Sequence, residues 1–113
     1  GTAPAGKKVF ENLCANCHRV NGNGVDFGPD LSEIGSKLSK EAIYNAILYP
    51  DQGISFGYEA WRLRMKDGSS AFGKILSESE DKVVVQYMTN TQTLNRADVV
   101  TKEKLENSLM PAN

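Results

Sequence analysis

The sequence predicts one mostly helical domain over residues 1–113, with an antiparallel β-meander inserted at about 58–96. Two observations support this fold class. Apolar residues recur every three or four positions in two early segments, which is the period of an amphipathic helix. After residue 56, apolar and polar residues alternate, and an Asp-Gly pair follows the first alternating run. This is the pattern of half-buried strands joined by a hairpin.

A first helix is predicted over residues 4–14. Pro4 suits the first turn of a helix, where an N–H would have no intrahelical partner. Gly6, Phe10 and Leu13 then recur at positions i, i+4 and i+7, which places them on one face. The helix therefore presents an apolar face and leads directly into the next motif.

Both cysteines and the single histidine lie within five residues, Cys14-Ala15-Asn16-Cys17-His18. A C-x-x-C pair can be a redox dithiol, half of a zinc site or, with histidine next, a haem attachment site. A disulfide here would close a very short loop and add little stability. A structural zinc site wants four ligands, but the chain has only three Cys or His residues. A thioredoxin-like dithiol would follow a buried strand, whereas this pair follows a predicted helix.

The geometry of this pentapeptide favours haem. Two cysteines three positions apart on a helical turn can bring their sulfur atoms to one porphyrin edge, where thioether bonds form. His18 then projects an imidazole nitrogen toward the iron from the same side. The sequence therefore predicts one covalently attached haem c, held by Cys14 and Cys17, with His18 as a ligand of the iron.

The next segments are a loop and a second helix. Glycines and a proline interrupt residues 21–35, which predicts a loop. Ser39 is a good N-cap for a helix that stops before Pro50. Ile43 and Ile47 share one face of this helix.

The remaining chain is predicted to be mostly strands. The stretch YEAWRLRM alternates, and Asp67-Gly68 is a strong hairpin signal. SAFGKIL and KVVVQYM are two more predicted strands, and QTLN is a short fourth. A short helix, TKEKLENS, is predicted to start near Thr101.

Composition excludes several classes of protein. Thirteen basic residues against fourteen acidic ones give a net charge of −1, without a basic run that could track phosphates. We therefore expect no nucleic-acid partner. No stretch approaches the ~20 apolar residues of a transmembrane segment. The N-terminus lacks an apolar signal core, so we expect that any export signal has been removed.

Several motifs together resemble class I cytochromes c. These are Gly6 and Phe10 in the first helix, CANCH, GPDL with its proline eleven residues past the histidine, and LMP near the end. The long insert, which contains GYEAWRLRMKDGSSAFGKILSES, is similar to c-type haem domains of planctomycete-type bacteria. In those bacteria the domain is often appended to large β-propeller dehydrogenase-like proteins. The resemblance covers essentially the whole chain and implies cytochrome c-like helices around a covalent haem.

The resemblance also implies roles for two further residues. Pro29 matches the proline whose carbonyl accepts the imidazole N–H of the proximal histidine and so orients it. The alternative is an ordinary loop proline. Met110 matches the distal ligand, and its rivals Met65 and Met88 lie in strand patterns, where methionine usually fills a core. The expected iron ligands are thus His18 and Met110, and the expected cofactor-binding residues are Cys14, Cys17, His18, Pro29 and Met110.

The expected function follows from this ligation. With both axial positions filled, the iron has no open position for substrate or gas, so we expect an electron carrier rather than an enzyme, able to form part of a larger redox enzyme. Electrons would pass by outer-sphere transfer through the haem edge. The alternatives are a haem enzyme or gas sensor with a displaceable sixth ligand, and an interaction module in which the β-meander is the working part.

Partners and location are expected to match this function. The expected partners are redox protein donors and acceptors, including a dehydrogenase domain on the same polypeptide. Haem attachment of this kind implies a periplasmic or otherwise exported protein.

One element of the family is missing from this sequence. Class I cytochromes c normally place a C-terminal helix after the distal methionine, where it crosses the first helix at its glycine and phenylalanine. This chain ends three residues after Met110. We therefore expect the face of Gly6, Phe10 and Leu13 to be covered by a further part of a longer polypeptide, by the β insert or by another molecule. Self-association through the Gly6 and Phe10 face is one form of this expectation.

Overall fold

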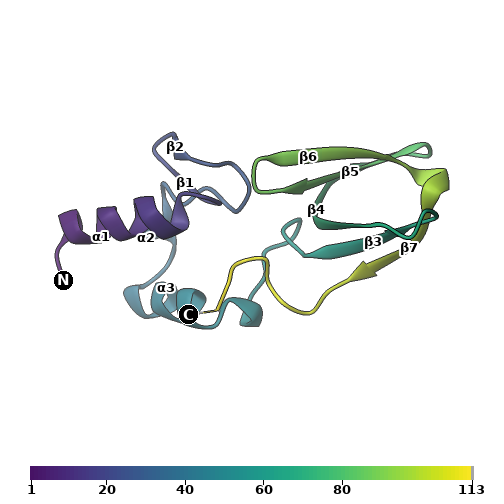
Figure 1. The fold of residues 1–113 in the computed structure, drawn as a ribbon. Coiled ribbons are helices and arrows are strands. Elements are labelled where there is room, and N and C mark those ends of the chain that lie inside the picture. The colour runs from purple at the N-terminus through teal and green to yellow at the C-terminus, as the bar shows by residue number, and fades with distance from the viewer. Residues whose placement is uncertain (113) are drawn as a thin grey trace.

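The computed structural model describes residues 1–112 and has a helical part and a five-stranded antiparallel sheet. The two parts lie at opposite ends of an elongated molecule that measures 51 × 26 × 22 Å (Figure 1). The C-terminal segment returns from the sheet to the helical part and ends beside the helix of residues 40–48.

The first helix forms as predicted, but its last turn is wider than an α-helix. Helix α1 (Ala3–Val9) continues into a π-helical turn, η1 (Phe10–Cys14). The Thr2 hydroxyl accepts the Ala5 N–H at 3.3 Å, which caps the start of α1. At the other end, the Ala15 N–H donates to the Phe10 carbonyl at 2.8 Å. The prediction of a helix leading into the cysteine motif is therefore confirmed.

The second predicted helix is also confirmed. Helix α3 (Lys40–Leu48) begins after Ser39, whose hydroxyl accepts the Ala42 N–H at 3.1 Å. A 3-10 turn, η2 (Pro50–Gln52), follows it. Within the predicted loop, short strand β2 (Asn23–Gly24) pairs with β1 (Arg19–Val20), which lies just before the loop, and the short helix α2 (Ile34–Lys37) begins at its end.

The predicted β-meander is present. Its strands are β3 (Trp61–Met65), β4 (Ser70–Glu78), β5 (Lys82–Tyr87) and β6 (Asn90–Asn95). Each pairs antiparallel with the next, and Asp67-Gly68 forms the tight turn between the first two. A 3-10 turn, η3 (Arg96–Asp98), then leads to a fifth strand.

The predicted C-terminal helix and the mostly helical fold class are both wrong. Residues Val99–Lys104 form strand β7, which pairs antiparallel with β3 and gives the strand order β6-β5-β4-β3-β7. Only 28% of the residues are helical, so the fold is mostly β. Pairing with β7 satisfies the backbone groups along one side of β3. Together with the β-branched Val99, Val100 and Thr101, this outweighs the helix propensity of the following Lys and Glu residues.

The sheet curls around its own hydrophobic core. Register shifts at Arg64/Met65 and Ile75/Ser77 bend the strands. Gly73 has φ +153°, and a Cβ atom there would lie 2.2 Å from the Gln86 carbonyl oxygen, so only glycine allows this close approach. The enclosed core consists of Leu63, Ala71, Val83 and Val85, with Trp61, Ile75, Leu94 and Val99 packed around it.

A three-residue ionic cluster closes the curled sheet. The Glu78 carboxylate at the end of β4 accepts from Lys102 Nζ on β7 at 2.7 Å and lies 3.1 Å from Arg96 in η3. The hydrogen bond from Lys102, and then the charges of Lys102 and Arg96, hold the pKa of Glu78 below its ordinary value of 4.5, although desolvation opposes them. Because β4 and β7 are not neighbours in the sheet, the cluster ties together strands that share no ladder.

We expect Glu78→Gln to lower the free energy of unfolding by about 1 kcal/mol at pH 7, as for a favourable surface ion-pair network. The folded-state pKa is lowered, so this contribution is complete above pH 4.5 and is lost as the pH falls through the lower folded-state value. Urea unfolding followed by the fluorescence of Trp61 measures it. Glu80 is exposed, so Glu80→Gln is the control and should have the free energy of unfolding of the wild type at both neutral and strongly acidic pH. If Glu78→Gln lowers the free energy of unfolding equally at these two pH values, the ionic cluster does not stabilise the sheet through the charge of Glu78.

The apolar face of the first helix is exposed over much of its area in the described residues, although Phe10 is partly buried. Val9 is 54% and Leu13 is 71% exposed, and no atom lies within 4 Å of where a Cβ on Gly6 would be. The sheet lies at the other end of the molecule, so the β insert does not cover this face (Figure 1). Self-association and coverage by a longer polypeptide stay predictions. In residues 1–112, no helix has both the length and the apolar character to cross a membrane.

Candidate functional site

The cysteine motif folds into a compact helical turn. The N–H groups of Cys17 and His18 both donate to the Cys14 carbonyl, at 3.1 and 2.9 Å. Both cysteines are free thiols and partly buried. The turn therefore presents two thiols and an imidazole from five consecutive residues.

A second segment runs alongside this turn and holds it. The Val25 N–H donates to the Ala15 carbonyl at 2.9 Å, and the Phe27 N–H donates to the Cys17 carbonyl at 3.2 Å. Phe27 is 3% exposed, so it anchors the segment in the interior. These contacts bring the Gly28-Pro29 pair next to His18.

The His18 imidazole is fixed by two contacts. Its Nδ1 lies 2.7 Å from the Pro29 carbonyl oxygen. A carbonyl only accepts, so Nδ1 carries the proton, and Nε2 keeps a free lone pair. Gly28 lies against the same ring: a Cβ there would lie 2.6 Å from His18 Cε1 and 2.9 Å from Nδ1, so the ring occupies the space that a side chain would fill. His18 is thus oriented as metal-binding histidines are.

The Cys17 thiol lies in surroundings that favour its neutral form. Burial raises the pKa of this thiol, and the neighbouring Cys14 raises it further. Among residues 1–112, no group of three or more His, Cys, Asp or Glu side chains is arranged to hold a metal ion.

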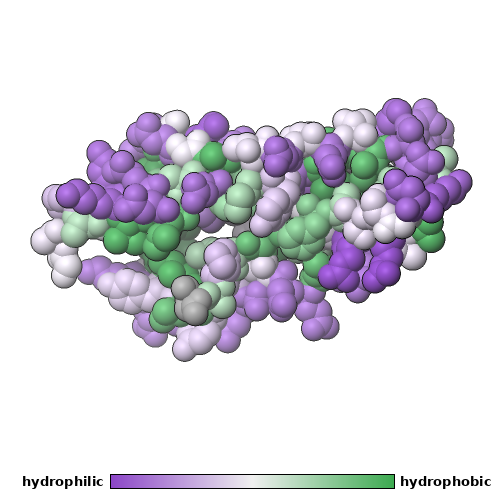
Figure 2. All heavy atoms as spheres, viewed as in Figure 1, coloured by the Kyte–Doolittle hydropathy of each residue, from purple (hydrophilic) through white to green (hydrophobic). Residues whose placement is uncertain are grey.

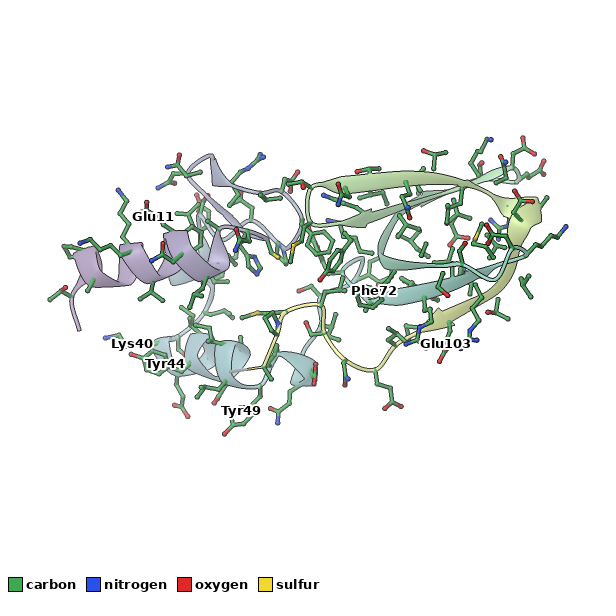
Figure 3. The ribbon with its side chains drawn as sticks, in the orientation of Figure 1. Glu11, Lys40, Tyr44, Tyr49, Phe72 and Glu103 are labelled. Atoms are coloured by element: carbon green, nitrogen blue, oxygen red, sulfur yellow. The ribbon has the colours of Figure 1, made fainter. Side chains whose placement is uncertain are left out.

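The helical part of the molecule lacks a core of its own. Within the described chain, α1, η1, α2 and α3 contain no buried residue. Four aliphatic side chains of these helices are at least half exposed, namely Val9, Leu13, Ile47 and Leu48, and Phe10, Ile34 and Ile43 are only partly buried. Figure 2 shows apolar residues on both sides of a hollow between the first helix and α3. Glu11 and Tyr49 point away from this space, toward solvent (Figure 3).

The residues around this hollow fit a haem. Two free thiols and an oriented imidazole come from one turn, and Gly28 leaves room for the ring. Exposed apolar surface on this scale is normally covered by a partner or a ligand. A porphyrin held here by Cys14, Cys17 and His18 would supply the core that the helices lack.

The C-terminal segment brings Met110 back to the helical part. The Leu105 N–H donates to the Ala60 carbonyl at 2.8 Å, and the Ser108 N–H donates to Asp51 Oδ1 in η2 at 2.5 Å. The Met110 N–H then donates to the Ser108 hydroxyl at 3.1 Å, and Met110 is partly buried. The segment that carries this methionine is therefore fixed beside α3 (Figure 1).

The rival methionines lie in the sheet part. Met65 ends β3, as expected of a strand residue. Met88 does not lie in a strand, contrary to the prediction. It occupies the turn between β5 and β6 with φ +54° and is 37% exposed.

Sequence reasoning missed three residues that shape the site. Gly28 lies against the imidazole, Asp51 anchors the segment of Met110, and Lys74 on β4 donates to the Phe27 carbonyl at 2.5 Å. The position of Gly28 directly before Pro29 could have indicated its role. The other two act across 57 and 47 residues of sequence, and no local pattern marks them.

The site combines an oriented imidazole with two free thiols, and it opens onto an apolar hollow. These features are those of a protein that holds a covalently attached haem. The family model described as Cytochrome c matches residues 3–92, from the first helix to the middle of β6. The chain therefore belongs to the cytochrome c family, and it is a haem-binding electron-transfer protein. A search of curated proteins finds no match. The matched residues include the Cys14–His18 turn but not Met110.

Proposed function

We propose that this chain is a monohaem c-type cytochrome that passes single electrons between redox proteins by outer-sphere transfer through the haem edge. The observation that carries the proposal is the contact between His18 Nδ1 and the Pro29 carbonyl, which leaves Nε2 free to bind iron. Bound at this site, the haem would supply a one-electron couple.

In this proposal, each site residue has one task. Cys14 and Cys17 hold the cofactor by thioether bonds, so it cannot dissociate when the protein changes partners. Pro29 keeps His18 in one orientation and one tautomer. Met110 would be the second protein ligand of the iron, and the anchoring of its segment to Asp51 through Ser108 supports this role. A thioether ligand raises the reduction potential and favours the ferrous state.

A haem enzyme or gas sensor is the competing function. It would need a displaceable sixth ligand and a polar group beside the iron. His18 is the only histidine of the chain, so no second imidazole can serve as that group. An apolar hollow with a thioether favours an electron carrier instead.

The proposed partners are a protein electron donor and a protein electron acceptor, one of which can be a dehydrogenase domain on the same polypeptide. A net charge of −1 provides little long-range steering, so docking would depend on close contact at the haem edge. The proposed location is outside the cytoplasmic membrane, in the periplasm or beyond. Thioether attachment at a C-x-x-C-H motif supports this location.

The test is the absorption spectrum of the reduced, haem-loaded protein with and without carbon monoxide. We expect no change on adding the gas, because His18 and Met110 would both ligate the iron. The intact mass should exceed the polypeptide mass by one haem, and acid-acetone should not extract it. A rapid spectral shift with carbon monoxide would overturn the carrier proposal. An extractable haem or two titratable thiols would overturn covalent attachment.

A further inference from the structure

Strand β4 of the sheet places a buried charge against residues 25–29, the segment that runs alongside the cysteine turn. Within residues 1–112, Lys74 is the one charged side chain that is buried, at 7% exposure. Its Nζ donates to the Phe27 carbonyl at 2.5 Å. This contact joins the sheet to the segment that runs alongside the cysteine turn.

The surroundings of this ammonium do not neutralise it. Its Nζ lies 4.5 Å from the Tyr58 ring centroid and 5.5 Å from that of Phe27, so two aromatic faces and one carbonyl solvate the charge. No carboxylate of the described residues lies within 4.0 Å of it. Burial lowers the pKa of Lys74, and Asp26 opposes this only in part. A buried, unpaired cation destabilises a fold, so its presence calls for a role.

Residues 26–29 connect the Lys74 ammonium to the His18 imidazole through a series of hydrogen bonds. Phe27, whose carbonyl accepts from Lys74, donates its own N–H to Cys17. Two residues further on, the Pro29 carbonyl accepts from His18. A second contact from the sheet, Gln86 Nε2 to the Asp26 carbonyl at 3.0 Å, holds the start of the same segment.

We propose that Lys74 is a positioning residue for the proximal side of the haem, an inference that rests on the proposed function. By holding the Phe27 carbonyl, it fixes the segment that aims Pro29 at His18. Its fixed positive charge also favours the ferrous state, which carries one positive charge fewer than the ferric state. The β insert is then part of the haem site rather than an appendage to it.

The experiment compares four haem-loaded variants with the wild type. Lys74→Met removes the charge and the hydrogen-bond donor, Lys74→Gln removes the charge but keeps a shorter donor, and Lys74→Arg keeps both the charge and a donor. Lys66→Met is the matched control, because it makes the same change at an exposed position of the same sheet part. The readouts are the ferrous-to-ferric ratio at the wild-type midpoint potential, and the exchange rate of the His18 Nδ1 proton measured by NMR.

We expect Lys74→Met to lower the ferrous-to-ferric ratio about tenfold, equivalent to ~59 mV for a one-electron couple. Exchange of the His18 proton should be severalfold faster. Lys74→Gln should show the lower ratio, whereas Lys74→Arg and Lys66→Met should stay within about twofold of the wild type.

The outcome separates this inference from the proposed function. A folded, haem-loaded Lys74→Met protein with the wild-type ratio and exchange rate overturns the role of Lys74 and leaves the carrier function intact. A wild type without covalent haem overturns the proposed function itself. If Lys74→Met does not fold, equal ratios for Lys74→Gln and Lys74→Arg overturn the role.

Discussion

Replacing Met110 with alanine is expected to open the sixth position of the iron. The weak thioether-to-iron charge-transfer band in the far red should vanish, and the reduced protein should now bind carbon monoxide. The reduction potential should fall by on the order of 100 mV, since axial ligands move haem potentials over a range of ~0.8 V. The physical reason is that alanine has no donor atom to replace the sulfur.

The matched controls are Met65→Ala and Met88→Ala, which remove a thioether from the sheet part. Both should keep the band, because one residue ends β3 and the other lies in the turn after β5. If the band survives in Met110→Ala and disappears in a control, the ligand has been assigned to the wrong methionine. Asp51→Ala should leave the ligand in place but loosen the segment that carries it.

The second large effect is expected for Gly28→Ala. The added methyl group would lie 2.6 Å from His18 Cε1, and the ring cannot move aside without breaking its hydrogen bond to Pro29. Overpacking of this kind costs about 1–3 kcal/mol. The fraction of purified protein that carries haem should fall roughly tenfold on this energy scale, as measured by the ratio of haem absorbance to protein absorbance.

Gly35→Ala is the control for this prediction. Gly35 lies in α2, and a Cβ there would meet no atom within 4 Å. Alanine should therefore be neutral, or stabilise the short helix by roughly 0.5–1 kcal/mol. Equal haem content in Gly28→Ala and Gly35→Ala would show that Gly28 does not position the imidazole.

Local sequence signals predicted the elements whose causes are local. The C-x-x-C-H turn, the Ser39 cap and the Asp67-Gly68 turn each depend on residues a few positions apart, and the structure contains all three elements. The same holds for the meander, whose strands pair with their sequence neighbours.

Distant contacts decide the features that local patterns did not show. The segment after Thr101 has helix-forming residues, but pairing with β3, some forty residues earlier, makes it a strand. Lys74 resembles any exposed strand lysine in the sequence, and only the docking of the sheet on Phe27 buries it. Met110 lies beyond all the predicted elements, and its approach to α3 depends on the bond between Ser108 and Asp51.

The unequal distribution of the core also determines how the protein matures. Leu63, Val83 and Val85 are almost fully enclosed within the sheet, so this part can complete its packing from the polypeptide alone. The helices contain no buried residue, and the proposed cofactor would supply their interior. We therefore expect the chain before attachment to be a finished sheet joined to loosely packed helices, with the thiols of Cys14 and Cys17 accessible to the attachment machinery. Haem insertion would then be the last step of folding, and we expect the helical part to resist proteases only after the cofactor is in place.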